Sequence, residues 1–180
     1  VGVVMVIAPW NYPLHTPINA IIPALLAGNS VILKHSSQTP LCAEQIFDAF
    51  KEAGLPEGVF QYLHMSHEYT EMAIQSHEIG AVAFTGSVPS GMKIDEAVTG
   101  RFIGVGLELG GKDPAYIRAD ADIAYAVEST VDGAYFNSGQ SCCGIERIYV
   151  HASIYDDYVA KFVALTRQYK LGCSDNPEIT

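Results

Sequence analysis

The feature that most constrains this chain is a regular alternation of short β-branched runs with longer amphipathic stretches. Val1–Ala8 is an apolar run that ends at Pro9, and Thr16–Ala27 has isoleucine and leucine at helical spacing. Further strands are predicted at Ser30–Lys34, Val59–His64, Ala81–Thr85 and Phe102–Leu109, and further helices at Pro40–Ala53, His67–Gln75 and Pro89–Ala97. This order favours right-handed crossovers and a parallel sheet covered on both faces. We therefore predict a doubly wound, Rossmann-like α/β fold that binds ligands beyond the carboxyl ends of its strands.

The alternation continues after the glycine pair Gly110–Gly111. The next elements are predicted as a strand at Ala115–Ile117, a helix at about Asp122–Phe136, a strand at Arg147–Val150 and a helix at about Ser153–Tyr169. We place a domain boundary at the glycines, with residues 1–109 in one domain and residues 110–180 in the start of a second α/β domain. The polar end, Cys173–Thr180, is predicted to be turn-like.

Composition excludes several classes of protein. The 180 residues include 10 Lys+Arg and 20 Asp+Glu, for a net charge of −10, and 49% are hydrophobic. A disordered chain needs lower hydrophobicity, and a nucleic-acid binder needs clustered basic residues. No apolar run reaches membrane-spanning length, and the apolar start lacks the basic flank of a signal peptide. Four cysteines, two of them adjacent, do not indicate a disulfide scaffold and favour a reducing, cytoplasmic location.

The sharpest local signal is NSGQSCCGIER at 137–147, where Cys142 and Cys143 lie between a glycine turn and a strand. A thiolate on such a loop is a candidate nucleophile, since it can meet both solvent and a favourable local field. Burial as a small apolar side chain is the alternative. A metal site with His151 is not predicted, because the adjacent cysteines lack CxxC spacing.

A second signal is VGLELGGKDP at 105–114, in which Glu108 lies inside an apolar strand. A buried carboxylate with a raised pKa would be a general base near neutral pH. The alternatives are a carboxylate on a solvated edge strand, or one paired with Lys112.

Three further motifs follow predicted strands. In APWNYP at 8–13, Asn11 lies between two prolines and could donate to an oxyanion, or form an Asx-turn. In VILKHSSQTP at 31–40, Lys34 could reach a ribose or phosphate, or remain solvated. In VAFTGSVPSG at 82–91, Gly86 and Ser87 could present a helix start to a phosphate, or form an ordinary strand–turn–helix connection.

The combination of these motifs resembles the aldehyde dehydrogenase superfamily. The matching segments are PWN at 9–11, the Lys34 segment with TP at 39–40, FTGS at 84–87, LELGGK at 107–112 and GQSC at 139–142. They occur in the family's order and at about its separations, over essentially the whole chain. Because members of the family are longer, the resemblance implies a fragment holding most of the cofactor domain and the start of the catalytic domain.

The resemblance implies three catalytic roles. Cys142, two residues after the Gln of GQxC, is the nucleophile, and Glu108 of ELGG is the general base. Asn11 of PWN stabilises the oxyanion together with the Cys142 backbone N–H. The implied reaction is oxidation of an aldehyde to a carboxylic acid through thiohemiacetal and thioester intermediates on Cys142.

The implied cofactor is NAD or NADP. Lys34 would contact the ribose, and Gly86 and Ser87 would face the pyrophosphate. The backbone that borders the cofactor belongs to Ile7, Ala8, Pro9, Trp10 and Leu109. Two positions depart from the common pattern: His35 replaces a frequent Pro, and Ser37 replaces the Glu of many NAD-preferring members. Since Ser37 cannot repel a 2′-phosphate, we predict that both cofactors are used.

Two alternative functions remain. CoA-acylating relatives generally lack the Glu of ELGG, so the presence of Glu108 argues against that class. A non-catalytic cofactor-binding relative would not need Cys142, Glu108 and Asn11 together. The resemblance further implies a small aldehyde substrate, a homo-oligomer when full length, no nucleic-acid or membrane partner, and little activity for this segment alone.

Overall fold

The computed structural model describes residues 2–172 and divides the chain into two compact units, Val1–Leu109 and Gly110–Thr180. The predicted turn-like segment Cys173–Thr180 lies outside the described residues. Each unit has its own hydrophobic core and is described by itself.

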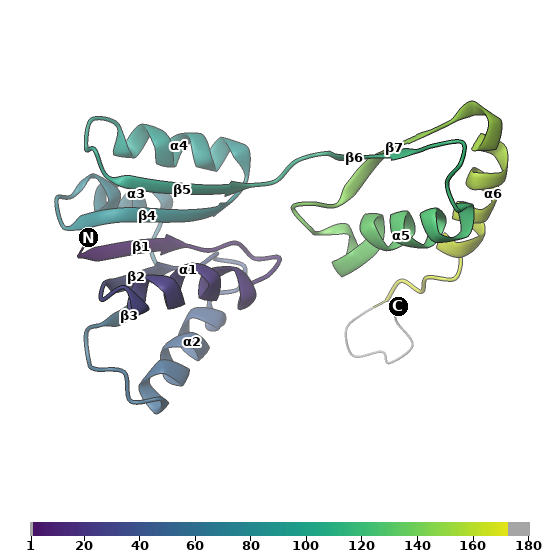
Figure 1. Ribbon diagram of the computed structural model, residues 1–180. Helices are drawn as coiled ribbons and strands as arrows, with labels where there is room; N and C mark the ends of the chain where they lie inside the picture. The colour runs from purple at the N-terminus through teal and green to yellow at the C-terminus, as the bar shows by residue number, and fades with distance from the viewer. Residues whose placement is uncertain (1, 173–180) are drawn as a thin grey trace. The chain divides into compact units, whose positions relative to one another are not determined.

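The first unit is a parallel sheet flanked by helices (Figure 1). Its elements are β1 (Val3–Ile7), α1 (His15–Leu26), β2 (Ser30–Lys34), α2 (Leu41–Glu52), β3 (Phe60–Tyr62), α3 (His67–Gln75), β4 (Ile79–Gly86), α4 (Val88–Val98) and β5 (Gly104–Leu109). The strand order is β3-β2-β1-β4-β5, and every neighbouring pair is parallel. The doubly wound fold predicted from the alternation is confirmed.

Strand β1 lies at the centre of this sheet because both of its faces are apolar. Val4 and Val6 pack with residues of α1 and α2 on one face, and Met5 and Ile7 pack with residues of α3 and α4 on the other. Successive side chains of a strand point to opposite faces, so a continuous apolar run suits a strand covered on both sides. Burying each such side chain contributes about 1.5–3 kcal/mol.

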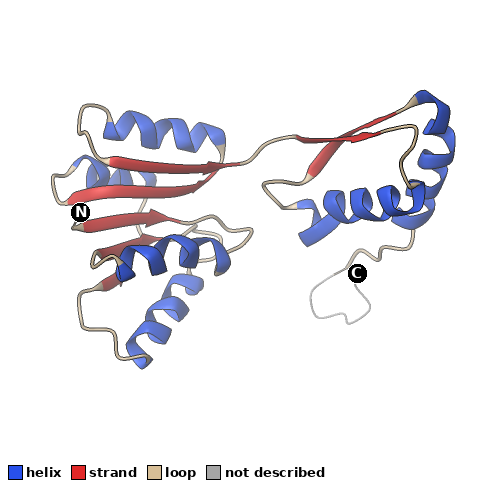
Figure 2. Cartoon of the chain, in the orientation of Figure 1, coloured by secondary structure: helices blue, strands red, loops and turns tan. Residues whose placement is uncertain are grey.

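The second unit is a β–α–β arrangement followed by a further helix (Figure 2). Its elements are β6 (Asp113–Ile117), α5 (Ile123–Tyr135), a 3₁₀ turn (Phe136–Gly139), β7 (Ile145–Val150), a second 3₁₀ turn (Ala152–Ile154) and α6 (Tyr155–Thr166). Strands β6 and β7 are parallel, and α5 forms the crossover between them. Buried residues of β6, α5 and α6 form one core cluster.

Most predicted boundaries differ from the structure by one to three residues, and two of the differences have a clear cause. The strand predicted at Val59–His64 is shorter, because β3 pairs with β2 over three residues only. The helix predicted from Ser153 begins at Tyr155, since His151 caps a separate 3₁₀ turn by accepting a hydrogen bond from the Ser153 N–H.

Tyr158 supports the core of the second unit and gives a test of its stability. Its side chain is 3% exposed, and its hydroxyl lies 2.6 Å from Thr130 Oγ1. Burial raises the pKa of Tyr158 above 10.0, so the folded state holds the phenol proton more tightly than the unfolded state. The resulting stabilisation of the folded state is complete below pH 10.0, the unfolded-state pKa, and is lost as the pH rises through the folded-state pKa.

Tyr158→Phe is expected to lower the free energy of unfolding by about 1 kcal/mol at neutral pH and to reduce its alkaline decline. Urea denaturation at neutral and alkaline pH measures both effects. Tyr155→Phe is the control, because Tyr155 is 51% exposed on the same helix. Equal effects of the two changes would contradict the role given to the buried hydroxyl.

Candidate active site

The carboxyl ends of the central strands meet at one edge of the sheet. Ile7 of β1 is in register with Lys34 of β2 and with Phe84 of β4, and Gly86 of β4 is in register with Leu109 of β5. The chain runs from β1 through β2 to β3 and then returns to β4 on the other side of β1, which makes the β1–β4 border the topological switch point. Ligands of open parallel sheets bind at such a point.

Lys34 ends β2 with its side chain buried. The residue is 7% exposed, so the alternative of a solvated lysine is wrong. Burial lowers the pKa of Lys34 from 10.5, because desolvation disfavours the charged form. Among residues 2–172, no carboxylate or other acceptor pairs with its ammonium group. A buried, unpaired ammonium is suited to an anionic or hydroxyl-bearing ligand.

Lys34→Met is expected to raise the free energy of unfolding by about 1 kcal/mol, because it removes a desolvated charge. The unfolded chain binds more protons than the folded one between the lowered Lys34 pKa and 10.5, so wild-type stability rises with pH in that window. The variant should lack this rise in denaturation curves taken across alkaline pH. Lys93→Met, at an exposed position of α4, is the control. A destabilised Lys34→Met protein would contradict the prediction.

Asn11 lies in the loop that joins β1 to α1. The loop leaves the sheet at Ala8, whose N–H donates to the Lys34 carbonyl at 3.1 Å. Asn11 is half-buried and the neighbouring Trp10 is 42% exposed. The loop therefore begins at the carboxyl edge, beside the end of β2.

The start of α4 follows Gly86 at the same edge. Ser87 is the N-cap and accepts a hydrogen bond from the Ser90 N–H, as an ordinary capping residue does. The first turn of α4 carries no acidic residue, so the positive end of the helix dipole is not neutralised from within. Gly91 lets α4 approach β5, since a Cβ at this position would lie 2.7 Å from Leu109 Cδ2.

Glu108 lies in β5, in register with Thr85, and its side chain is exposed among the described residues. This position differs from the buried carboxylate that the apolar strand suggested. The proposed pairing with Lys112 is also wrong: Lys112 Nζ lies 2.5 Å from Glu146 Oε2. Among residues 2–172, no basic side chain forms an ion pair with Glu108.

Cys142 lies on a tightly turned loop of the second unit. Three consecutive residues before it adopt left-handed backbone conformations: Asn137 (φ 50°), Ser138 (φ 59°) and Gly139 (φ 72°). Such a conformation costs a non-glycine residue about 1–2 kcal/mol, although asparagine tolerates it better than most. Cys142 and Cys143 are both exposed free thiols, so the alternative of a buried cysteine is wrong.

Gly111 holds the backbone of Cys142. Its N–H donates to the Cys142 carbonyl at 3.2 Å. Within the described part of the chain, no backbone carbonyl accepts a hydrogen bond from the Cys142 N–H. No pattern in the sequence indicated that Gly111 or the Lys112–Glu146 ion pair would anchor this loop.

The predicted site residues thus fall into two groups. The first unit gathers its group at the carboxyl edge of one sheet or on the loops that leave it: Ile7, Ala8, Pro9, Trp10, Asn11, Lys34, Ser37, Gly86, Ser87, Glu108 and Leu109. Cys142 belongs to the second unit, where Gly111 binds its carbonyl. The three catalytic candidates therefore come from both units.

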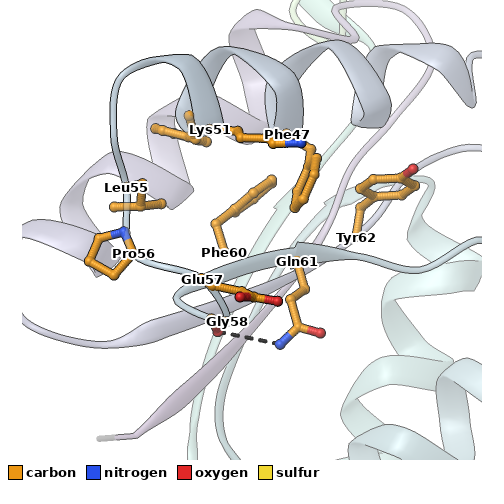
Figure 3. Close-up of a pocket in the computed structure, with 10 residues that line it drawn as sticks. Phe47, Lys51, Leu55, Pro56, Glu57, Gly58, Phe60, Gln61 and Tyr62 are labelled. Carbon is orange, nitrogen blue, oxygen red and sulfur yellow. Dashed lines mark hydrogen bonds between the residues drawn. The ribbon is translucent and has the colours of Figure 1, made fainter.

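A pocket of about 660 Å³ lies elsewhere in the first unit (Figure 3). Its walls come from the second half of α2, from β3 and from their connection, which enters β3 at the amino edge of the sheet. Phe47, Phe50 and Phe60 form an aromatic cluster there. None of the predicted site residues lines this pocket.

Residues 2–172 contain neither a cluster of metal-ligating side chains nor a membrane-spanning helix. No group of three histidine, cysteine or acidic side chains in this part of the chain could hold a metal ion. None of its helices combines the length and apolar character needed to cross a membrane.

The sheet order and the polar groups at its carboxyl edge place the chain in the class of doubly wound α/β proteins with a switch-point site. The model of the aldehyde dehydrogenase family matches residues 1–180, and the chain belongs to that family. The chain is 38% identical over 179 residues to a D-glyceraldehyde dehydrogenase (NADP(+)) of Picrophilus torridus. This match covers 99% of the chain and 36% of that relative.

Two further comparisons agree. The chain is 38% identical over 177 residues to succinate-semialdehyde dehydrogenase [NADP(+)] 1 of Mycobacterium tuberculosis, covering 98% of this chain and 39% of the relative. The chain is also similar to the solved structure of a 3,6-anhydro-L-galactose dehydrogenase in complex with NAP, with a TM-score of 0.95 and 34% sequence identity. This match covers 99% of the chain and 38% of the solved one. The chain thus spans well under half the length of these relatives.

Proposed function

We propose that this chain supplies the cofactor-binding domain (residues 1–109) and the nucleophile-bearing start of the catalytic domain (residues 110–180) of an NAD(P)-dependent aldehyde dehydrogenase. The observation that carries the proposal is the exposed Cys142 thiol, whose loop is bound by Gly111. Gly111 is three residues beyond Glu108 along the chain. One continuous stretch of sequence therefore carries both the proposed base and the residue that binds the Cys142 loop.

The first step forms a bond between Cys142 and the substrate. The thiolate attacks the aldehyde carbon, and the carbonyl electron pair moves to oxygen, giving a thiohemiacetal anion. The Asn11 side chain and the Cys142 N–H donate hydrogen bonds to that oxygen. One such donor contributes about 3 kcal/mol in comparable sites.

The second half of the reaction releases the product. NAD or NADP, which Lys34 and the start of α4 would hold, would supply hydride acceptance from the thiohemiacetal carbon, and a thioester would remain on Cys142. Glu108 takes a proton from a water molecule, whose oxygen adds to the thioester carbon. The C–S bond then breaks, the thiolate departs and a carboxylic acid is formed.

The residues of the carboxyl edge fit NAD or NADP. The buried ammonium of Lys34, which has no partner among residues 2–172, suits a ribose hydroxyl or a phosphate. The start of α4, without an acidic residue in its first turn, suits the pyrophosphate. Ser37 is exposed and carries no charge that would repel a 2′-phosphate, and relatives named for NADP(+) support use of that cofactor.

Ser37→Glu is expected to lower kcat/KM for NADP+ by about tenfold or more and to leave kcat/KM for NAD+ within a few-fold, since a carboxylate repels the 2′-phosphate. Steady-state rates with each cofactor measure the change. Gln38→Glu, which adds the same charge one residue later at an exposed position, is the control. A strong preference of the wild type for NAD+ would contradict dual use.

Product analysis of the complete subunit tests the proposed function. An aldehyde and NADP+ should yield a carboxylic acid and reduced cofactor in equal amounts, with or without coenzyme A. Formation of an acyl-CoA would favour the CoA-acylating alternative. Cofactor binding without turnover of any aldehyde would favour the non-catalytic alternative.

We also propose that the complete protein is a cytoplasmic homo-oligomer that acts on small aldehydes. The family resemblance supports the assembly, and a catalytic thiol needs a reducing compartment. Light scattering of the complete protein tests the oligomeric state.

A further inference from the structure

We propose that His35 is a positioning residue that holds the Asn11 loop against the segment carrying Lys34 and Ser37. The inference rests on the proposed function, because it assigns a task to loops that this function uses. His35 acts through the backbone of one loop, at the Pro13 carbonyl, and through a side chain of the other, at Thr39.

His35 is buried and hydrogen-bonded through both ring nitrogens. The residue is 3% exposed, with Nε2 2.7 Å from the Pro13 carbonyl oxygen and Nδ1 3.2 Å from Thr39 Oγ1. Because a carbonyl has no proton to give, Nε2–H is the donor to Pro13. In the neutral ring Nδ1 then accepts from the Thr39 hydroxyl. The two partners therefore fix both the orientation and the tautomer of the ring.

The bond to Pro13 is one hydrogen bond that holds the Asn11 loop. Another is the bond from the Ala8 N–H to the Lys34 carbonyl. The loop that carries Asn11 is thus attached at both ends, at Ala8 and at Pro13, to the consecutive residues Lys34 and His35. Two ties on adjacent residues set where the loop lies relative to the end of β2.

The bond to Thr39 holds the second loop, which follows β2 and carries Ser37. Thr39 closes a turn through its own N–H, which donates to the Ser36 carbonyl at 3.2 Å, and Ser37 lies exposed within that turn. One buried ring therefore joins the loop of the proposed oxyanion donor to the turn beside the proposed cofactor contact. Oxyanion donors act only within about 0.5 Å of their working position, and a displacement of about 1 Å can cost 10²-fold in rate.

Three variants of the complete enzyme separate these ties. His35→Leu removes both, and should lower kcat by about tenfold to 10²-fold and raise KM for the cofactor several-fold. His35→Gln keeps an N–H group at the reach of Nε2, and should retain kcat within about threefold. Thr39→Val removes only the second bond, and should raise the cofactor KM with little change in kcat. His77→Leu, at an exposed histidine, is the control.

Hydrogen exchange gives a readout that does not depend on turnover. Mass spectrometry of a peptide spanning residues 5–16, which contains the hydrogen-bonded amides of Ala8 and Thr16, should show faster amide exchange in His35→Leu and near wild-type exchange in His35→Gln. If the wild type oxidises no aldehyde, the proposed function fails. The exchange data would still test whether His35 holds the Asn11 loop. Wild-type exchange in His35→Leu, or a loss of kcat in His35→Gln as large as in His35→Leu, would overturn the inference. If His35→Leu does not fold, His35→Gln and Thr39→Val decide by the same criteria.

Discussion

Cys142→Ser is expected to abolish aldehyde oxidation, lowering kcat by on the order of 10⁴-fold or more, whereas Cys143→Ser should stay within a few-fold of wild type. A serine hydroxyl is almost fully protonated at neutral pH and is a far weaker nucleophile than a thiolate. Both thiols are exposed, so accessibility alone does not choose between them. The family motif GQxC makes the choice, because Cys142 is two residues after Gln140.

Two measurements on the complete enzyme check this assignment. Steady-state rates give the loss of turnover, and the mass of the protein quenched during turnover with aldehyde and cofactor identifies the acylated residue. Cofactor affinity should be unchanged in both variants, which controls for misfolding. Turnover that depends on Cys143 and survives Cys142→Ser would overturn the mechanism proposed above.

Glu108→Gln is expected to stall the enzyme after its first half-reaction. An amide cannot take a proton from water, so thioester hydrolysis should slow by about 10²- to 10⁴-fold, while thiohemiacetal formation and hydride transfer still proceed. Rapid mixing should therefore show a burst of reduced cofactor close to one equivalent per site, followed by a very slow steady state.

Glu128→Gln is the matched control, because it makes the same change at an exposed position of α5. It should keep the wild-type steady-state rate. A Glu108→Gln enzyme with wild-type steady-state turnover would show that another group activates the water. A variant without a burst would instead place Glu108 in the first half-reaction.

The elements of the fold were largely predictable from the sequence, because local patterns determine them. Ser30–Lys34 and His67–Gln75 are observed with the predicted bounds. The first is a mostly apolar run that follows the stop signal Gly28–Asn29, and the second is a polar helix that begins after its capping residue Ser66. The glycine and serine at 86–87 likewise end a strand and cap a helix through contacts within a few residues. Local chemistry of this kind can be read from one sequence.

The supports of the site could not be predicted, because they join residues far apart in the chain. The Lys112–Glu146 pair spans 34 residues, and the bond between His35 and Pro13 spans 22. Such partners depend on which strands lie side by side and in which register, and composition or spacing does not determine that. The burial of Lys34 has the same origin, since a strand-end lysine can be exposed or covered depending on the loops around it.

The place of β1 in the sheet also bears on biosynthesis. This strand is the middle of five, yet one of its two partners, β4, emerges from the ribosome only after α1, α2 and α3 have been made. During translation β1 can pair with β2 while its opposite border stays open, and an open strand border invites pairing with other nascent chains. We expect codon changes that slow translation between β3 and β4 to increase co-translational aggregation of this protein and its recruitment of chaperones.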